Sequence, residues 1–158
     1  MSRQKLALIT GATKGIGRST SIAFSKAGWD LILLARNQNM LEDLKKELSA
    51  KSNKVYLINC DLSQSDVINS SLKNVIEESG CPSVLINNAG FAYNGDLIGM
   101  PLETWQKIIQ VNLTSIFQIC SFTIPFMRKD GGLIINVSSH AANNAFPQWS
   151  AYCVSKAA

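Results

Sequence analysis

Short apolar runs alternate along the chain with longer amphipathic stretches, and short polar connections separate them. The apolar runs have the length of strands and are apolar nearly throughout, which is typical of parallel strands covered on both faces. They predict five strands, at residues 6–10, 31–35, 55–60, 83–87 and 133–137.

The stretches between these strands have the spacing of helices. Apolar residues at positions 40, 41, 44 and 48, with charged residues between them, form one face of a helix. Gly28 is a stop signal for the first helix, and Ser63 is the expected N-cap of the third. The predicted helices span residues 15–27, 40–48, 63–78 and 102–127, and a last one begins near Ser150.

Strand and helix in regular alternation predict an α/β fold with right-handed crossovers. We expect a Rossmann-like, doubly wound parallel sheet with strand order 3-2-1-4-5. A ligand crevice should lie at the carboxyl ends of strands one and four. Without an internal linker or repeat, residues 1–158 are predicted to form a single dinucleotide-binding domain.

Composition narrows the functional classes. The net charge is only +4 and its cations are scattered, without a basic stripe and interleaved aromatic residues, so no nucleic acid partner is expected. The four cysteines form no C-x-x-C pair, and free thiols in a reducing cytoplasm are the expected state. Residues 1–5 lead into an apolar run too short for a signal peptide core or a membrane span. We therefore expect a cytoplasmic protein with no membrane partner and no metal.

A glycine-rich turn follows the first strand. Glycines let the chain turn sharply and approach a pyrophosphate, while the following helix supplies free N–H groups and the positive end of its dipole. The spacing is G-x-x-x-G-x-G, which by itself also fits a plain tight turn. The residues expected to bind a cofactor here are Gly11, Thr13, Lys14, Gly15, Ile16 and Gly17.

The end of the second strand bears on the choice between NAD and NADP. NAD sites usually place a carboxylate there, but this chain has Ala35 followed by Arg36. Arg36 offers a planar, bidentate cation for a 2′-phosphate, and Lys14 could add a second charge. Both could also be ordinary surface cations. The pattern favours NADP(H).

Two more segments are candidates for cofactor contacts. Asp61, followed by Leu62, comes after the third strand, where its carboxylate could accept from an adenine amino group or cap the next helix. Asn87, Ala89 and Gly90 close the fourth strand, and small residues there would let a cofactor pass close to the backbone. The Asn87 amide could equally tie adjacent strands together.

Near the C-terminus, Tyr152 and Lys156 stand four residues apart, a spacing that places them on one face of a helix. An ammonium beside a phenol favours the phenolate, which makes the phenol a stronger acid. An exposed helical pair without a catalytic role is the alternative interpretation. His140 is assigned no catalytic role.

Taken together, these motifs resemble those of the short-chain dehydrogenases/reductases, in particular NADPH-dependent members similar to 3-oxoacyl-[acyl-carrier-protein] reductase. The matching elements are T-G-x-x-x-G-I-G at 10–17, N-N-A-G at 87–90, Asn112, the serine of N-V-S-S at 136–139, and Y-x-x-x-K at 152–156. They cover essentially the whole length present, in the order and spacing of that family.

The resemblance implies a catalytic set. Tyr152 would be the general acid in carbonyl reduction, and Ser139 rather than Ser138 would hydrogen-bond the substrate oxygen. Lys156 would bind the nicotinamide ribose and promote ionisation of the tyrosine. Asn112 would hold a water that connects the lysine to solvent, although it could merely mend a local hydrogen-bond kink in its long helix.

Members of this family continue beyond Y-x-x-x-K, so the resemblance also implies a C-terminally incomplete fold that lacks the last strands. We then expect an exposed strand-five edge and exposed apolar surface. The first functional hypothesis is an NADPH-dependent carbonyl reductase acting on a keto or 3-oxoacyl substrate, and family analogy suggests a dimer or tetramer. The competing hypothesis is a non-catalytic dinucleotide-binding module.

Overall fold

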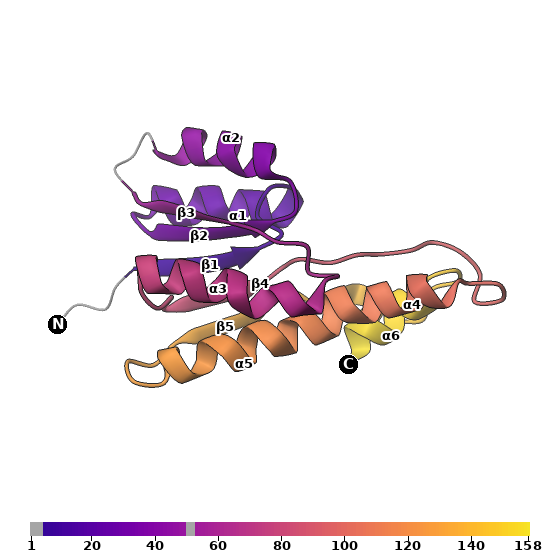
Figure 1. The fold of residues 1–158 in the computed structure, drawn as a ribbon. Helices are drawn as coiled ribbons and strands as arrows, with labels where there is room; N and C mark the ends of the chain where they lie inside the picture. The colour runs from indigo at the N-terminus through magenta and orange to yellow at the C-terminus, as the bar shows by residue number, and fades with distance from the viewer. Residues whose placement is uncertain (1–4, 50–52) are drawn as a thin grey trace.

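The computed structural model describes residues 5–49 and 53–158. Residues 1–4, on which part of the targeting prediction depends, lie outside this range. Five parallel strands form one sheet in the order β3-β2-β1-β4-β5, as predicted (Figure 1). The strands are β1 (Leu6–Thr10), β2 (Asp30–Ala35), β3 (Val55–Asn59), β4 (Val84–Asn87) and β5 (Leu133–Asn136).

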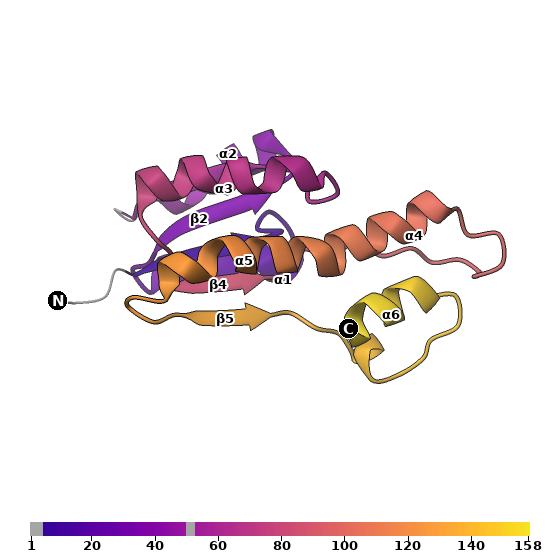
Figure 2. The ribbon, with the colours of Figure 1, turned by 60° about the horizontal axis from the view of Figure 1, so that its bottom comes forward.

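Helices cover both faces of this sheet. One apolar cluster joins one face to α1 and α2, and a second cluster joins the opposite face to α3 and α5 (Figures 1 and 2). The helical segments are α1 (Gly15–Lys26), α2 (Gln38–Leu48), α3 (Ser65–Ser79), α4 (Leu102–Ile109), α5 (Ser115–Met127), α6 (Ser150–Ala157), the π-helical turn η2 (Gln110–Thr114) and the 3₁₀ turn η3 (His140–Ala142).

The central strand, β1, shows why the sheet has an apolar core on each face. In β1, the side chains of Leu6 and Leu8 belong to one cluster, while those of Ala7 and Ile9 belong to the other. All four residues are fully buried, because successive side chains of a strand point to opposite faces. Burying a side chain of the size of leucine contributes roughly 1.5–3 kcal/mol, so the continuous apolar runs specify a strand sandwiched between helices.

The start of α3 differs from the prediction. Ser63 does not cap this helix, which begins at Ser65 after Gln64. The Asp61 carboxylate accepts from the main-chain N–H of Ser63 at 2.9 Å, and the Asp61 carbonyl accepts from the N–H of Gln64 at 2.9 Å. Both bonds hold residues 61–64 in a turn, which delays the helix. The predicted Ser63 cap was therefore wrong.

The predicted long helix from 102 to 127 exists but is not uniform. Its α-helical parts α4 and α5 are joined by η2, whose wider turn contains Asn112. The run is long enough to cross a membrane, and an 18-residue window within it is apolar enough, with a mean hydropathy of 1.3. This is a weak indication, since core helices pass the same test, and α5 here packs against α3 and the sheet.

β5 is the most exposed strand of the described sheet. Leu133 and Ile135 are 54% and 39% exposed, whereas β1 and β2 are almost entirely buried and β3 is partly buried. The expected exposed edge is therefore present. From this edge the chain continues through η3 to α6, which packs against α4 and η2 (Figure 2).

Candidate functional site

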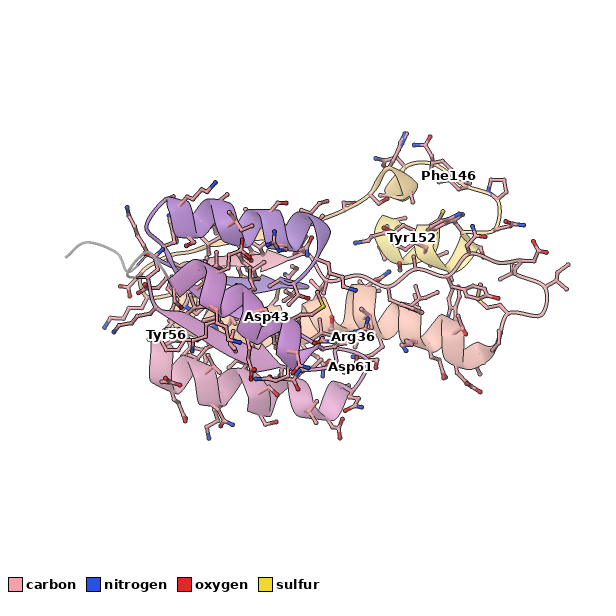
Figure 3. The ribbon with its side chains drawn as sticks, turned by 90° about the horizontal axis from the view of Figure 1, so that it is seen from above. Arg36, Asp43, Tyr56, Asp61, Phe146 and Tyr152 are labelled. Atoms are coloured by element: carbon pink, nitrogen blue, oxygen red, sulfur yellow. The ribbon has the colours of Figure 1, made fainter. Side chains whose placement is uncertain are left out.

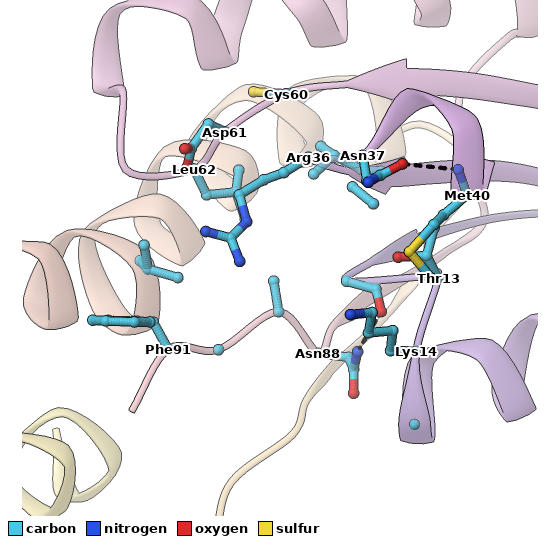
Figure 4. A pocket seen from close by; sticks show the side chains of 17 residues that line it. Thr13, Lys14, Arg36, Asn37, Met40, Cys60, Asp61, Leu62, Asn88 and Phe91 are labelled. Carbon is cyan, nitrogen blue, oxygen red and sulfur yellow. Dashed lines mark hydrogen bonds between the residues drawn. The ribbon is translucent and has the colours of Figure 1, made fainter. Parts of the chain in front are cut away.

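A cavity of about 690 Å³ lies along the carboxyl ends of β1 to β4, where the crevice was predicted. Its wall comes from the loops that follow these strands and from the middle of the long helix (Figure 4). The lining residues are Gly11, Thr13, Lys14, Gly15, Leu34, Ala35, Arg36, Asn37, Met40, Cys60, Asp61, Leu62, Asn88, Ala89, Gly90, Phe91 and Val111.

The glycines of the loop after β1 are required for different physical reasons. Gly11 has a φ of +64° and Gly15 a φ of +50°, in the left-handed region that glycine adopts readily. A Cβ on Gly17 would instead clash with the carbonyl oxygen of Gly11. Gly15 lines the cavity with no atom near its virtual Cβ, so its backbone is open to a ligand. Ile16 and Gly17 do not line the cavity.

The loop is held in place by a residue that the sequence analysis did not assign. Asn88 donates from Nδ2 to the carbonyl of Thr10 at 2.9 Å, and its main-chain N–H donates to Thr10 Oγ1 at 3.0 Å. Asn88 thus ties the end of β4 to the end of β1 at the cavity wall. In the sequence, the signal that could have indicated this role was the position of Asn88 in the N-N-A-G motif.

Asn87 has a different place from its neighbour. It is buried, and its Nδ2 donates to Asn136 Oδ1 at 2.9 Å, which links β4 to β5. This is the strand-tying role that the sequence left open. Asn87 is not among the residues that line the cavity, whereas Ala89 and Gly90 are.

Two positively charged side chains line the cavity: Arg36, which follows β2, and Lys14, which lies in the glycine loop after β1. The Arg36 side chain extends into the cavity, and Lys14 stands across from Arg36 on the glycine loop (Figure 4). Asn37 accepts from the main-chain N–H of Met40 at 3.0 Å, so the prediction that α2 starts at Met40 placed it two residues late. The last residue of β2 is Ala35, and no carboxylate stands there.

Asp61 lies beside Arg36 at the same end of the cavity (Figures 3 and 4). Burial alone would raise the pKa of Asp61. Hydrogen bonds from Ser63 and the charges of Arg36 and Lys107 outweigh it, and the net result is a lowered pKa. Asp61 is therefore an anionic acceptor at neutral pH, with Leu62 next to it on the cavity wall.

The family-implied tyrosine and lysine lie on α6, on the far side of the loop after β4 (Figure 3). The Lys156 ammonium lies 6.0 Å from the centroid of the Tyr152 ring. It donates to the main-chain carbonyl of Val137 at 2.8 Å, just beyond β5. Burial lowers the pKa of Lys156. The two side chains are thus neighbours in a partly desolvated place.

Asn112 connects this helix to the cavity. Its Nδ2 donates to the Phe91 carbonyl at 2.9 Å, and its Oδ1 accepts from the Phe91 N–H at 2.7 Å. A second Nδ2 bond, also 2.9 Å, reaches Ser155 Oγ on α6. These partners lie on other segments, so the side chain does not mend its own helix.

The two candidate serines differ in their surroundings. Ser139 Oγ accepts from the N–H of Ala141 at 3.2 Å and caps η3, which leaves its hydroxyl hydrogen available as a donor. Ser138 is exposed. His140 lies 5.8 Å from the Phe146 ring, centroid to centroid. Among residues 5–49 and 53–158, no group of His, Cys, Asp or Glu side chains could hold a metal ion, and the four cysteines form no disulfide with one another.

Comparison with known proteins gives consistent relatives. The chain is 35% identical over 156 residues to the 3-oxoacyl-[acyl-carrier-protein] reductase FabG of Thermotoga maritima, covering 97% of this chain and 63% of the relative. The chain spans between 26% and 63% of the length of the curated relatives that it matches.

Solved structures share the fold as well. A metagenomic short-chain oxidoreductase in complex with NADP superimposes with a TM-score of 0.91 at 33% identity, over 96% of this chain and 70% of that chain. An NAD⁺-bound xylitol dehydrogenase gives 0.89 at 25% identity, over 97% and 60%. The family model of the short chain dehydrogenases matches residues 5–158. The chain therefore belongs to the short chain dehydrogenase family of oxidoreductases.

Proposed function

We propose that this chain carries the cofactor site and the proton-transfer residues of an NADPH-dependent oxidoreductase that reduces a keto or 3-oxoacyl group to an alcohol. In this proposal Tyr152 is the general acid. Lys156, Ser139 and Asn112 complete the catalytic set.

The proposal rests on what surrounds Gly90. A Cβ on this residue would lie 3.7 Å from Asn112 Oδ1 and 4.0 Å from Lys156 Nζ. Gly90 itself lines the cavity that begins at Arg36. The Lys156 ammonium therefore stands at the Gly90 end of that cavity, with Tyr152 next to it on α6. A ligand that extends from Arg36 along the cavity and beyond Gly90 would approach the proposed proton donor.

The residues at the Arg36 end fit the adenosine half of a dinucleotide. The first N–H groups of α1, open at Gly15, suit a pyrophosphate, and the ionised Asp61 can accept from an adenine amino group. The choice of NADP over NAD is supported by Arg36 and Lys14, since two cations favour a 2′-phosphate and a carboxylate at the end of β2 is absent. Gly11, Thr13, Leu62 and Ala89 complete the wall.

When bound, the nicotinamide cofactor supplies the hydride, and the protein manages the proton. Ser139, whose hydroxyl hydrogen is free to donate, would hold the carbonyl oxygen of the substrate. Tyr152 would then give its phenolic proton to that oxygen as negative charge develops there. Lys156 has three donor hydrogens, of which Val137 takes one, so it can also bind a ribose hydroxyl.

We propose a narrower role for Asn112 than the one that the resemblance implies. Both hydrogens of its side-chain amide are donated, to Phe91 and Ser155. A water could be held only through the second lone pair of Oδ1 or through the main-chain carbonyl of Asn112. In our proposal the Asn112 side chain fixes the Phe91 backbone and α6.

The test is NADPH oxidation by the 158-residue chain, followed by absorbance, with acetoacetyl coenzyme A as a 3-oxoacyl thioester and ethyl acetoacetate as a simple keto ester. Turnover should fall about 10²- to 10⁴-fold in Tyr152→Phe, the contribution usual for a general acid. Tyr56→Phe removes a hydroxyl from β3, away from the cavity, and should leave turnover unchanged.

A second candidate function is a dinucleotide-binding module without catalysis. One observation favours it: the cavity is lined at the adenosine end but not by Ser139, Tyr152 or Lys156. Binding of NADPH without oxidation by either probe would select this function and contradict the first.

We further propose a cytoplasmic homo-oligomer that associates through its long helix. Two apolar side chains of α5, seven residues apart and therefore on one face of the helix, are exposed: Phe117 by 69% and Ile124 by 40%. Exposed apolar clusters of this kind mark interaction surfaces. Light scattering after gel filtration should give a multiple of 17.2 kDa, and Phe117→Glu should shift it to the monomer.

A further inference from the structure

The helix that carries Tyr152 and Lys156 is attached to the rest of the site through Ser155. This serine is 4% exposed, and Asn112 is 2% exposed. Asn112 Nδ2 donates to Ser155 Oγ at 2.9 Å. Ser155 Oγ in turn donates to the carbonyl of Tyr152 at 2.8 Å. A single buried hydroxyl therefore joins η2 to the backbone of the tyrosine itself.

The Phe91 backbone fixes the direction of this chain of hydrogen bonds. Its N–H donates to Asn112 Oδ1 at 2.7 Å, and its carbonyl accepts from Asn112 Nδ2 at 2.9 Å. Rotating the amide by half a turn would place donor against donor and acceptor against acceptor. The remaining amide hydrogen of Asn112 must then point to Ser155. Since the hydrogen of Ser155 goes to Tyr152, the oxygen of Ser155 is the acceptor.

We infer that Ser155 is a positioning residue of the proposed reaction: its hydroxyl locks α6 to Asn112 and so fixes where Tyr152 and Lys156 stand relative to the Gly90 end of the cavity. This inference rests on the proposed function. Lys156 follows Ser155 directly, and Tyr152 lies three residues before it, so any shift of this attachment moves both groups.

Loss of the hydroxyl has two consequences. Asn112 keeps its bonds to Phe91 but has a buried N–H without an acceptor, and such a donor is costly. To pair it again, α6 or Asn112 must move. Misplacement of reacting groups lowers kcat steeply, while cofactor contacts at the distant Arg36 end are unaffected. The expected signature is a lower kcat with a smaller rise in KM for NADPH, because in our proposal the displaced Lys156 also binds a ribose hydroxyl of the cofactor.

The chain offers matched variants. Ser155→Ala removes the hydroxyl, and Ser155→Thr keeps it on the same carbon. Ser150→Ala removes another buried hydroxyl from α6, one that has no hydrogen-bond partner among the described residues. Ser155→Ala should lower kcat by about tenfold to a hundredfold, the loss expected when reacting groups are misplaced by up to about 1 Å. Ser155→Thr should restore most of the loss, and Ser150→Ala should have no effect.

A second readout needs neither cofactor nor substrate. In NMR spectra of the ¹⁵N-labelled chain, the Asn112 side-chain amide should exchange its hydrogens with solvent at least about tenfold faster in Ser155→Ala. Exchange in Ser155→Thr and Ser150→Ala should match the wild type. Urea unfolding of each variant shows whether it is folded. If Ser155→Ala is unfolded, the kinetic assay uses Asn112→Ser instead, because this variant removes the partner amide.

The outcomes separate this inference from the proposed function. Unchanged Asn112 exchange in folded Ser155→Ala, or unchanged kcat, overturns the role of Ser155. Equal losses in Ser155→Ala and Ser150→Ala also overturn it, because the loss is then not specific to the bond. If the wild type binds NADPH but oxidises none with either probe, the proposed function fails, and faster Asn112 exchange still establishes the attachment of α6.

Discussion

The ammonium of Lys156 donates a hydrogen bond to the main-chain carbonyl of Val137, and the two atoms lie 2.8 Å apart. Val137 directly follows β5, whereas Lys156 belongs to α6, so this bond joins the helix to the sheet. One donor hydrogen of the lysine is thus used structurally, and two remain for a ligand.

Lys156→Met tests the burial of this charge through the pH dependence of stability. Burial lowers the pKa of Lys156 below its ordinary value of 10.5. Between the lowered pKa and 10.5 the unfolded chain binds more protons than the folded one, so the stability of the wild type rises with pH. The difference in unfolding free energy, wild type minus Lys156→Met, should therefore increase from neutral pH toward 10.5.

Urea unfolding of both proteins at a series of pH values measures this difference, and effects of other groups cancel in the subtraction. A difference that stays flat, or that falls as the pH rises, would show that the folded protein does not disfavour the ammonium.

Arg36→Ala should discriminate between the two nicotinamide cofactors. Arg36 faces the cavity where a 2′-phosphate would lie, and a charge-assisted hydrogen bond is worth about 1.5–3 kcal/mol. The Kd for NADPH should rise about tenfold to a hundredfold, while that for NADH stays the same. Titration calorimetry gives both constants. Arg128→Ala, an exposed arginine after α5, is the control, and equal losses for NADPH and NADH would contradict the assignment.

Gly17→Ala tests whether the close packing at this position outweighs the higher helix propensity of alanine. Alanine in place of a helical glycine normally stabilises by up to about 1 kcal/mol. At position 17, however, the new Cβ would clash with the Gly11 carbonyl oxygen, and overpacking of this kind costs about 1–3 kcal/mol. We expect a net loss of stability in thermal or urea unfolding. Ser19→Ala, exposed on the same helix, should be nearly neutral, and stabilisation by Gly17→Ala would refute the close contact.

Asp61→Asn separates the charge of this residue from its turn-forming hydrogen bond, because asparagine keeps an acceptor for the Ser63 N–H. The pKa of Asp61 lies below its ordinary value of 3.8. Its ionisation therefore stabilises the fold above 3.8, and this contribution is lost as the pH falls through the lowered pKa.

For this partly exposed group we expect the variant to be less stable at neutral pH by no more than about 1 kcal/mol. The difference should vanish in acid, as followed by urea unfolding. A stability loss that is the same in acid as at neutral pH would mean that the asparagine perturbs the turn rather than the charge.

The sequence by itself determined the layout of this protein. Continuous apolar runs such as 6–10 and 31–35 can be buried on both faces only as parallel strands between helices, which is why the order 3-2-1-4-5 could be predicted. The glycine loop, Arg36 and the Tyr152–Lys156 pair were also visible, because each depends on residue type and on spacing within one segment.

The tertiary structure decided the contacts between segments. Asn88, not Asn87, holds the glycine loop, because the two neighbours point to different sides of β4. The turn at Asp61 moves the start of α3, and the meeting of Asn112 with Ser155 depends on how α6 packs on η2. The periodicity of a segment shows which of its residues share one face of that helix or strand. It does not show which polar atoms of distant segments lie opposite each other, because that depends on how the segments pack.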